Sequence, residues 1–261
     1  MPTLELDHDL CIQCGLCAGV CPIHVIGRHR DGRVEVVRRL IPRCIQCGHC
    51  VAVCPRGALT LNEVAPDTLQ AVHEAPLDVL QRDMLFKSRR SIRRFKEEPV
   101  PLPLLREALE DARYAPTGGN NQAVEWLLVD GRDKLRTIGT RIADWLAENG
   151  GPYRAVATAF RAGSDPIFRN APTLILAHSE VAIPSGVQDA SAAVSYLELS
   201  LHSRGLGSCW AGFPVDAAQA GVDLGLPIPE GRQIHAGLMI GFSQTRFVRV
   251  PPRRPVRLTI I

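Results

Sequence analysis

The pattern of apolar and polar residues predicts both helices and strands beyond residue 83. Apolar residues recur at helical spacing over 102–115, and 132–151 and 189–205 are also predicted helices, the first stopped by glycines and the second almost wholly apolar. Continuous apolar runs predict buried strands at VEWLLVDG, PTLILAHS, IHAGLMIGFS and the C-terminal VRLTII. Helices and strands mixed in this way indicate an α/β or α+β domain.

The N-terminal part of the chain, 1–62, follows a different pattern. In VIGRHRDGRVEVV (25–37), Asp31 and Gly32 form a turn signal between two short β-branched stretches, which predicts a small hairpin. Residues 63–82 contain two prolines and predict a linker with at most one turn of helix. The sequence thus predicts a small domain at 1–62, a linker at 63–82 and a larger domain at 83–261.

Composition and charge narrow the class of protein. The chain is 46% hydrophobic and 22% charged, which is typical of a water-soluble globular protein. No apolar run is long enough to span a bilayer, and the acidic start MPTLELDHDL does not resemble a signal peptide. We therefore expect a cytoplasmic protein without a membrane partner. A net charge of +3 is too small to indicate nucleic-acid binding.

Eight of the nine cysteines lie between Cys11 and Cys54, in two runs of the form C-x2-C-x2-C-x3-C-P. The second run, which starts at Cys44, is a near-copy of the first and shares nine of twelve positions with it. In such runs three thiolates bind one iron–sulfur cluster and the fourth binds the other, whereas zinc, the alternative, usually takes separated C-x2-C pairs. We therefore assign Cys11, Cys14, Cys17 and Cys54 to one [4Fe–4S] cluster, and Cys44, Cys47, Cys50 and Cys21 to a second.

These runs resemble the bacterial two-cluster ferredoxins, and the resemblance covers the first sixty residues. It implies a low-potential electron carrier with pseudo-twofold symmetry. Ferredoxins of this type are usually acidic, whereas residues 1–62 hold seven Arg and five acidic residues, a net charge of +2. A basic surface would suit an acidic ferredoxin or flavodoxin. The alternative is an Arg-rich surface with no such role.

Four segments of the larger domain carry side chains suited to a flavin nucleotide. KSRRSIRRFK (87–96) has six basic residues in ten, and arginine binds phosphate oxygens bidentately. A solvated basic face is the alternative, while nucleic acid is not expected without a second basic stripe. APTGGNNQAVEW (115–126) places three carboxamides in a glycine-rich loop, where they offer donors and acceptors to a flavin edge. GLGSCWAGF (205–213) and GFSQTRFVRVPPRRPV (241–256) complete the set.

In order and spacing these segments resemble the FMN-dependent nitroreductase family over residues 85–256. The sequence departs from the family at Ala123, where Pro-Trp often follows the Gln directly. The resemblance implies roles for eight residues, with Arg253 as the fallback for the last. Arg89, Arg90, Ser91 and Arg93 would hold the FMN phosphate, Asn120 and less surely Gln122 the flavin ring, Gly212 the region of flavin N5, and Arg254 the phosphate again.

The resemblance also implies an α+β sandwich in which two subunits share a helical interface with FMN at the seam, and hence a homodimer. The apolar helix 189–205 fits such an interface, although burial in a monomer core would explain it too. Residues 145–170, with Tyr153, Phe160 and Phe168, are proposed as a lid that selects substrate, and a plain surface excursion is the alternative.

The remaining candidates for chemistry receive structural roles. Cys209 lies between Ser208 and Trp210, and we interpret it as a small buried hydrophobe rather than a nucleophile. No histidine pair has metal-ligand spacing. His178 and His235 lie in or at the ends of predicted strands and are expected to be structural.

The sequence therefore predicts an oxidoreductase that passes electrons between two [4Fe–4S] clusters and FMN and reduces a small organic acceptor, such as a nitroaromatic or a quinone. No catalytic side chain is predicted, because the flavin carries the chemistry. The donor stays open between ferredoxin, flavodoxin and NAD(P)H. One alternative is an electron-transfer or redox-sensing flavoprotein that serves a protein partner. Another is a reductive dehalogenase-like or flavin-fragmenting enzyme on the same fold.

Overall fold

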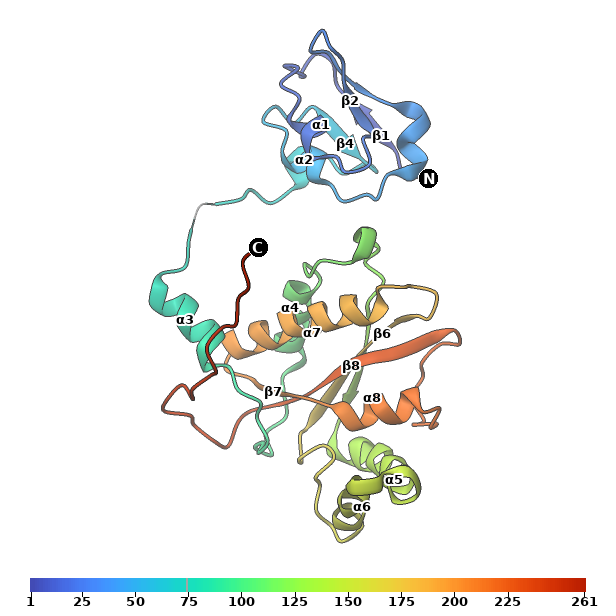
Figure 1. The fold of residues 1–261 in the computed structure, drawn as a ribbon, viewed down its shortest axis with the longest axis vertical. Helices are drawn as coiled ribbons and strands as arrows, with labels where there is room; N and C mark the ends of the chain where they lie inside the picture. The colour runs from blue at the N-terminus through green and yellow to red at the C-terminus, as the bar shows by residue number, and fades with distance from the viewer. Residues whose placement is uncertain (74) are drawn as a thin grey trace. The chain divides into compact units, whose positions relative to one another are not determined.

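The computed structural model of the chain describes residues 1–73 and 75–261, so residue 74 of the predicted linker lies outside the described residues. The chain divides into two compact units (Figure 1). The first takes Met1–Pro76 and Gly119–Asn121, and the second takes Leu77–Gly118 and Gln122–Ile261.

The first unit contains two small antiparallel sheets and two short helices. Strand β1 (Leu4–Leu6) pairs with β4 (Leu59–Leu61), which ties the two ends of the unit together. Strands β2 (Ile26–Arg28) and β3 (Val34–Val36) form the predicted hairpin, with Gly32 at φ 87° in its turn. The other elements are α1 (Leu16–Val20), η1 (Arg38–Arg43), α2 (His49–Ala52) and η2 (Pro66–Thr68).

The sequence repeat is also a repeat of backbone conformation. Gly15 and Gly48 occupy equivalent positions and precede α1 and α2 with φ values of 79° and 72°. Gln13 and Gln46, a second equivalent pair, have φ values of 57° and 53°. Glycine adopts this left-handed region without strain, while glutamine does so only where its surroundings hold it there. Each run therefore bends around its cysteines in the same way.

Helix α3 (Val79–Ser88) begins inside the segment predicted to be a linker. Its start is a capping box. The Asp78 carboxylate accepts a hydrogen bond from the Gln81 N–H at 2.8 Å, and the Gln81 side chain accepts one from the Asp78 N–H at 3.4 Å. Such a box satisfies two backbone donors that would otherwise lack partners. The predicted single turn is thus a ten-residue helix that leads into the basic segment.

The second unit is built on a four-stranded antiparallel sheet in the order β5-β6-β8-β7. Strand β6 is buried at seven of its eight residues, so both faces of the sheet are covered. The strands are β5 (Glu125–Asp130), β6 (Thr173–Glu180), β7 (Gly207–Trp210) and β8 (Arg232–Gly241), and η3 (Gly118–Asn120) precedes the first of them.

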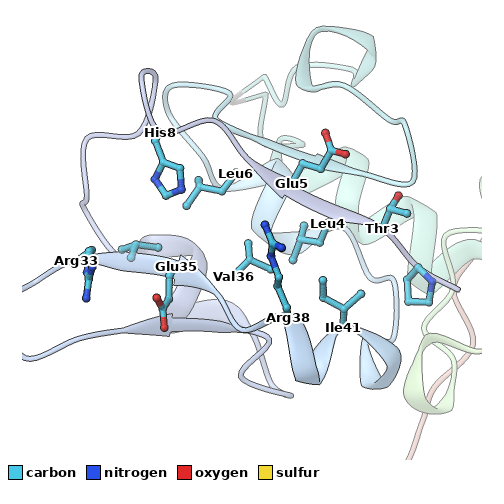
Figure 2. Close-up of a pocket in the computed structure, with 12 residues that line it drawn as sticks. Thr3, Leu4, Glu5, Leu6, His8, Arg33, Glu35, Val36, Arg38 and Ile41 are labelled. Carbon is cyan, nitrogen blue, oxygen red and sulfur yellow. The ribbon is translucent and has the colours of Figure 1, made fainter.

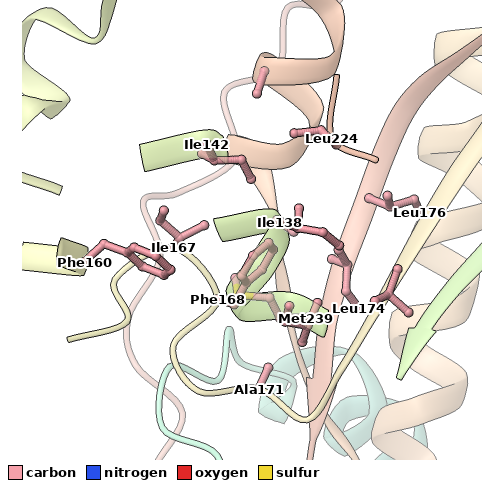
Figure 3. Packing of buried hydrophobic residues seen from close by; sticks show 14 of the residues in the cluster. Ile138, Ile142, Phe160, Ile167, Phe168, Ala171, Leu174, Leu176, Leu224 and Met239 are labelled. Carbon is pink, nitrogen blue, oxygen red and sulfur yellow. The ribbon is translucent and has the colours of Figure 1, made fainter. Parts of the chain in front are cut away.

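Helices cover the two faces of this sheet in separate layers. On one face α4 (Leu102–Ala112) and α7 (Gly186–Ser203) pack their apolar sides onto Ile175 and Leu238. The other face forms a second core around Leu174, Leu176 and Met239 (Figure 3). Its covering elements are α5 (Arg132–Asn149), η4 (Gly151–Tyr153), α6 (Arg154–Arg161) and α8 (Gly212–Gln219). The predicted α+β class is confirmed.

The prediction of a last strand at VRLTII is wrong. Residues 256–261 belong to no strand, and Val256 and Ile260 are 90% and 85% exposed. β-Branched residues favour an extended chain, but a strand forms only where it can pair with another strand's edge. No strand in the described part of this chain pairs with the segment.

Much of the segment proposed as a lid is core instead. Phe160 on α6 is 3% exposed and Phe168 is fully buried, and both pack in the cluster of Figure 3. Tyr153 remains 55% exposed, with its ring edge-on to Phe213 at 5.5 Å between centroids. The prediction that Phe160 and Phe168 belong to a substrate-selecting lid is thus wrong. Their burial depends on α5 and the sheet, which the local sequence does not reveal.

Replacement of Phe168 tests this correction. We expect Phe168→Ala to lower the free energy of unfolding of the second unit by about 3–5 kcal/mol, because it opens a cavity in a packed core. Phe247→Ala, at a side chain that is 52% exposed, should change it by less than about 0.5 kcal/mol. Guanidinium unfolding followed by tryptophan fluorescence measures both. Equal effects would contradict the assignment of Phe168 to the core.

Candidate functional site

The structure brings seven of the eight N-terminal cysteines together in two sets that cross between the runs. Burial, together with smaller contributions from the nearby thiols of Cys47, Cys21 and Cys44, raises the pKa of the Cys50 thiol to about 11. In the other set, burial raises the pKa of Cys17, with smaller contributions from Cys54 and Cys11. Cys21 therefore lies with the second run and Cys54 with the first, while Cys14 is exposed.

Backbone and side-chain donors reach the sulfur atoms of both sets. The Val25 N–H donates to Cys21 Sγ and the Ala58 N–H to Cys54 Sγ, each at 3.3 Å and at equivalent positions of the repeat. The Gln46 N–H donates to Cys44 Sγ at 3.4 Å. A small cavity lies against all four of Cys21, Cys44, Cys47 and Cys50.

Soft thiols gathered at a cavity fit an iron–sulfur cluster. Buried thiols that lie close together become thiolates when a cationic centre binds among them. Hydrogen bonds to the sulfur atoms then adjust the reduction potential of that centre. Among residues 1–73 and 75–261, no three His, Cys, Asp or Glu side chains converge closely enough to hold a single metal ion.

The basic segment of the second unit runs along the edge of β7. Ser91 forms a parallel bridge to Ser208, and the Ile92 N–H donates to the Ser208 carbonyl at 2.8 Å. This pairing fixes the backbone between Arg89 and Arg93. A cavity of about 260 Å³ lies beside it, lined by Ser88, Arg89, Arg90, Ile92, His202, Gly205, Leu206, Gly207, Ser208, Ser243, Thr245 and Phe247.

Arg90 has the character of an anion-binding group. Its Nε is buried and has no hydrogen-bond partner in the described part of the chain, while Nη2 donates to the Lys87 carbonyl. Burial lowers the pKa of Arg90, and the positive charges of Arg253 and Arg89 lower it further. An orphaned guanidinium N–H between two other arginines fits a phosphate, which supplies both acceptors and negative charge.

A buried carboxylate, Glu198, holds part of this segment in place. Glu198 on α7 has 7% of its surface exposed. Its Oε1 accepts from Arg89 Nη1 at 3.3 Å and from Ser208 Oγ at 3.1 Å, and its Oε2 accepts from Trp210 Nε1 at 3.0 Å. Three donors offset much of the cost of burying the charge. Sequence reasoning missed this residue, although a carboxylate within the apolar stretch of a predicted helix was a signal.

The carboxamide loop after α4 is anchored by a second buried acid that the sequence did not reveal. The Asp189 carboxylate accepts from the Gly118 N–H at 2.9 Å and from Ser185 Oγ at 2.8 Å. A Cβ at Gly118 would lie 2.5 Å from Ser185 Oγ, so the close approach requires glycine. Beyond it, Asn120 and Gln122 have φ values of 55° and 49°. Backbone strain of this kind often occurs at ligand sites.

The other predicted flavin residues are less constrained. Gly212 is the first residue of α8 and is separated from β7 by one residue, Ala211. Arg93 is exposed, and its positive charge lowers the pKa of Cys209, although burial has the larger, opposite effect. Arg254, the predicted phosphate ligand, is exposed. Its neighbour Arg253, named as the fallback, is the one of the two whose positive charge lowers the pKa of Arg90.

The residues expected to be structural have structural partners. Cys209 is 6% exposed, and burial raises its pKa. His178 Nδ1 accepts from Arg232 Nε at 2.9 Å, and His235 Nε2 lies 2.9 Å from Ser179 Oγ. These contacts tie neighbouring strands β6 and β8 together.

Comparison with protein-family models gives two matches. Residues 86–242 match the nitroreductase family, and residues 10–59 match a 4Fe-4S dicluster domain. Both agree with the resemblances drawn from the motifs, in the same order along the chain. The first match covers more than half of the chain.

Individual relatives point the same way. An iodotyrosine deiodinase from Thermotoga neapolitana is 32% identical over 140 residues, which are 48% of this chain and 69% of that protein. A nitroreductase with bound FMN from Bacteroides fragilis superposes with a TM-score of 0.62 at 21% identity, over 71% of this chain and 100% of its own. A nitroreductase with bound FMN from Desulfitobacterium hafniense gives 0.57 at 23% identity, over 68% and 96%. The two structures show that the fold is shared.

Proposed function

Since the chain belongs to the nitroreductase family and carries an N-terminal 4Fe-4S dicluster domain, we propose that it passes electrons between two [4Fe–4S] clusters and FMN to reduce a small organic acceptor, such as a nitroaromatic or a quinone. It is an FMN-dependent oxidoreductase of this family. The observation that carries the proposal is that thiols gather in two crossed sets in one unit, and arginines gather around an orphaned Nε in the other.

The cysteine ligands are proposed as the sequence assigned them. Cys11, Cys14, Cys17 and Cys54 would hold one cluster, and Cys44, Cys47, Cys50 and Cys21 the other. The N–H groups of Val25 and Ala58 would donate to one sulfur in each. Such donors stabilise the added negative charge of a reduced cluster and so favour its acceptance of an electron.

The FMN contacts are proposed as the resemblance to the family implies them. Arg89, Arg90 and Ser91, with Arg253 or Arg254, would bind the phosphate, and Glu198 would orient Arg89 for this role. Arg93 would also bind the phosphate, Asn120 and Gln122 would bind the ring edge, and the Gly212 backbone would lie near flavin N5. The bound flavin supplies hydride or single-electron transfer, so no catalytic side chain is proposed. The protein residues bind and orient the cofactor.

The homodimer stays a prediction, and exposed apolar side chains support it. Leu80 and Phe86 on α3 are 68% and 59% exposed, and Val187 on α7 is 54% exposed. Apolar surface of this kind commonly marks an interface. Mass measured in solution by light scattering decides the point. No helix in the described residues could cross a membrane, and the cytoplasmic location stays a prediction.

Reductive dehalogenation is a second candidate, because the similarity to an iodotyrosine deiodinase reaches 32% identity. Both candidates require reduced FMN and differ in the small molecule that oxidises it. A protein-to-protein electron carrier would lack such an acceptor altogether.

The crossed cluster assignment is testable by paired cysteine substitutions. The wild type should carry about eight iron atoms per chain. Cys11→Ala/Cys54→Ala removes two ligands of one proposed cluster and should leave about four, with one intact [4Fe–4S] signal in electron paramagnetic resonance. Cys11→Ala/Cys21→Ala removes one ligand from each and should leave no intact cluster with four cysteine ligands. The reverse result would show that each run ligates its own cluster.

The role of Arg90 is testable by FMN binding. We expect Arg90→Ala to raise the Kd of FMN about tenfold to a hundredfold, because a charge-assisted hydrogen bond to phosphate is lost. Arg204→Ala is the control, since Arg204 pairs with Asp111 at 2.8 Å and lies in a different ion pair. Titration of the flavin-free protein, followed by flavin fluorescence, measures both. Equal affinity in wild type and Arg90→Ala would remove Arg90 from the site.

The proposed electron path is tested anaerobically on protein loaded with clusters and flavin. NADH, NADPH or a reduced ferredoxin is added in separate cells, and the flavin absorbance band is followed. We expect at least one donor to bleach it and a nitroaromatic, a quinone or an iodophenol to restore it. Product analysis then distinguishes nitro reduction from dehalogenation. Bleaching that no small molecule reverses would contradict an enzymatic role, and absence of a flavin band would contradict the FMN assignment.

A further inference from the structure

The cavity beside the basic segment carries an unbalanced charge. Arg89, Arg90 and His202 line it, and none of its lining residues, all within the described chain, is Asp or Glu. A pocket of about 790 Å³ in the first unit instead carries charges of both signs. Figure 2 shows the residues that supply them, which are Glu5, Glu35, Arg33, Arg38 and His8. The cavity in the second unit is therefore the one suited to a negatively charged ligand.

His202 lies in the last turn of α7 and is tied to α3. Its Nε2 lies 2.8 Å from Ser88 Oγ, and the Ser88 hydroxyl donates to the Met84 carbonyl. Since a hydroxyl has one hydrogen, Ser88 Oγ accepts from His202, and Nε2 carries the hydrogen of the neutral ring. Ser88 directly precedes Arg89 and Arg90 in the sequence. The ring is therefore held at the start of the basic segment, and a further proton on it goes to Nδ1.

The surroundings of His202 keep its ring neutral in the protein alone. Burial lowers the pKa of His202 most, and the positive charges of Arg89 and Arg90 lower it further, while a hydrogen bond to the Met84 carbonyl raises it. The ordinary pKa of histidine is about 6.5. A pKa below that value leaves the ring largely uncharged at neutral pH.

The other charged groups on the elements around His202 have partners or act elsewhere. Glu198, one turn earlier on α7, accepts from the three donors described above. The ion pairs on the neighbouring helices are Arg204 with Asp111 and Glu107, and Lys87 with Asp83. On the C-terminal segment, Arg253 acts on Arg90. The remaining sides of the cavity are lined by uncharged residues, which are Ile92, Gly205, Leu206, Gly207, Ser208, Ser243, Thr245 and Phe247.

We propose that His202 is a further binding residue of the FMN phosphate site, and that its ring takes up a proton from solvent when the phosphate binds. The inference rests on the proposed function. A phosphate dianion offsets the charges of Arg89 and Arg90 and favours the protonated ring. The proton joins Nδ1, while the Nε2–H group keeps its hydrogen bond to Ser88. The bound phosphate then faces a third positive charge.

A histidine suits this position better than a permanent cation. A third guanidinium or ammonium group would repel Arg89 and Arg90 in the protein without cofactor, and so would destabilise the folded chain. A neutral imidazole avoids this cost, and it becomes charged only after an anion has entered the cavity. The second unit thus adds positive charge at the moment when the ligand supplies negative charge.

The pH dependence of FMN affinity tests this proposal. Above about pH 7 the phosphate is already dianionic, because its second pKa is about 6. The Kd of FMN for the full-length, cluster-loaded, flavin-free protein is measured by flavin fluorescence from about pH 7 to about pH 8.5. We expect the wild-type Kd to rise about threefold or more, since the raised pKa of His202 in the complex means that the complex loses this proton as the pH rises.

Two variants show whether His202 is the group that titrates. His202→Gln keeps a side-chain N–H donor for Ser88 but takes up no proton, so its Kd should change by less than about 1.5-fold over the same range. His73→Gln is the control at an exposed histidine of the segment 63–82, and it should keep the wild-type dependence. A purely structural role of His202 would weaken binding equally at every pH.

Proton uptake gives the second readout. Isothermal titration calorimetry of FMN binding near pH 7.5, in buffers with different ionisation enthalpies, measures the number of protons bound with the cofactor. The wild type and His73→Gln should take up a fraction of a proton, and His202→Gln close to none. Equal uptake in wild type and His202→Gln would assign the proton to another group and overturn the proposal, as would a loss of uptake in His73→Gln.

The wild type alone also decides the matter if His202→Gln does not fold. A wild-type Kd that is constant from about pH 7 to about pH 8.5, with no proton taken up, overturns the role of His202 and leaves the FMN assignment intact. A wild type that binds no FMN at any pH contradicts the proposed function itself. The two failures are therefore distinguishable.

Discussion

Groups of the same kind lie close together in each unit of this chain, thiols in the first and arginines in the second. The free-energy cost of this crowding must be offset by a bound group that is not part of the protein. In the first unit, burial and neighbouring thiols raise the pKa of Cys17 and of Cys50. In the second, Arg90 lies near Arg89 and Arg253 with a buried Nε that no residue of the described chain satisfies. An arrangement of this kind persists only if a partner of opposite charge completes it. Iron would complete the first and a phosphate the second.

The protein neutralises only part of the second site by itself. Glu198 accepts from Arg89, Ser208 and Trp210, so it fixes one arginine and joins α7, β7 and the basic segment. It leaves the Nε of Arg90 without a hydrogen-bond partner among the described residues. A carboxylate closer to Arg90 would stabilise the folded protein and compete with a bound anion. The observed placement orients one guanidinium and keeps another available, which is the compromise that binding sites commonly make between stability and function.

The sequence predicted those features that depend on local pattern. The Asp31–Gly32 turn, the cysteine spacing and the helix at 132–151 each carry their signal within a few residues, and the structure contains all three elements. The errors occurred where a partner distant in the sequence decides the outcome. VRLTII has the composition of a strand but no edge to pair with, and Phe168 is core because α5 and the sheet cover it. Glu198 and Asp189 were missed for the same reason, since their donors lie on other elements.

The two copies of the cysteine repeat share their backbone conformation but differ in their surface side chains. Positions that shape the backbone, such as Gly15 and Gly48 or Gln13 and Gln46, keep the same conformation in both copies, because each run must bend around its ligands in the same way. Positions on the surface have diverged, with Leu16 in one copy where His49 stands in the other. Ligation constrains the first set of positions and does not constrain the second. A difference in surface chemistry between the two equivalent cysteine loops therefore reflects their surroundings rather than the demands of ligation.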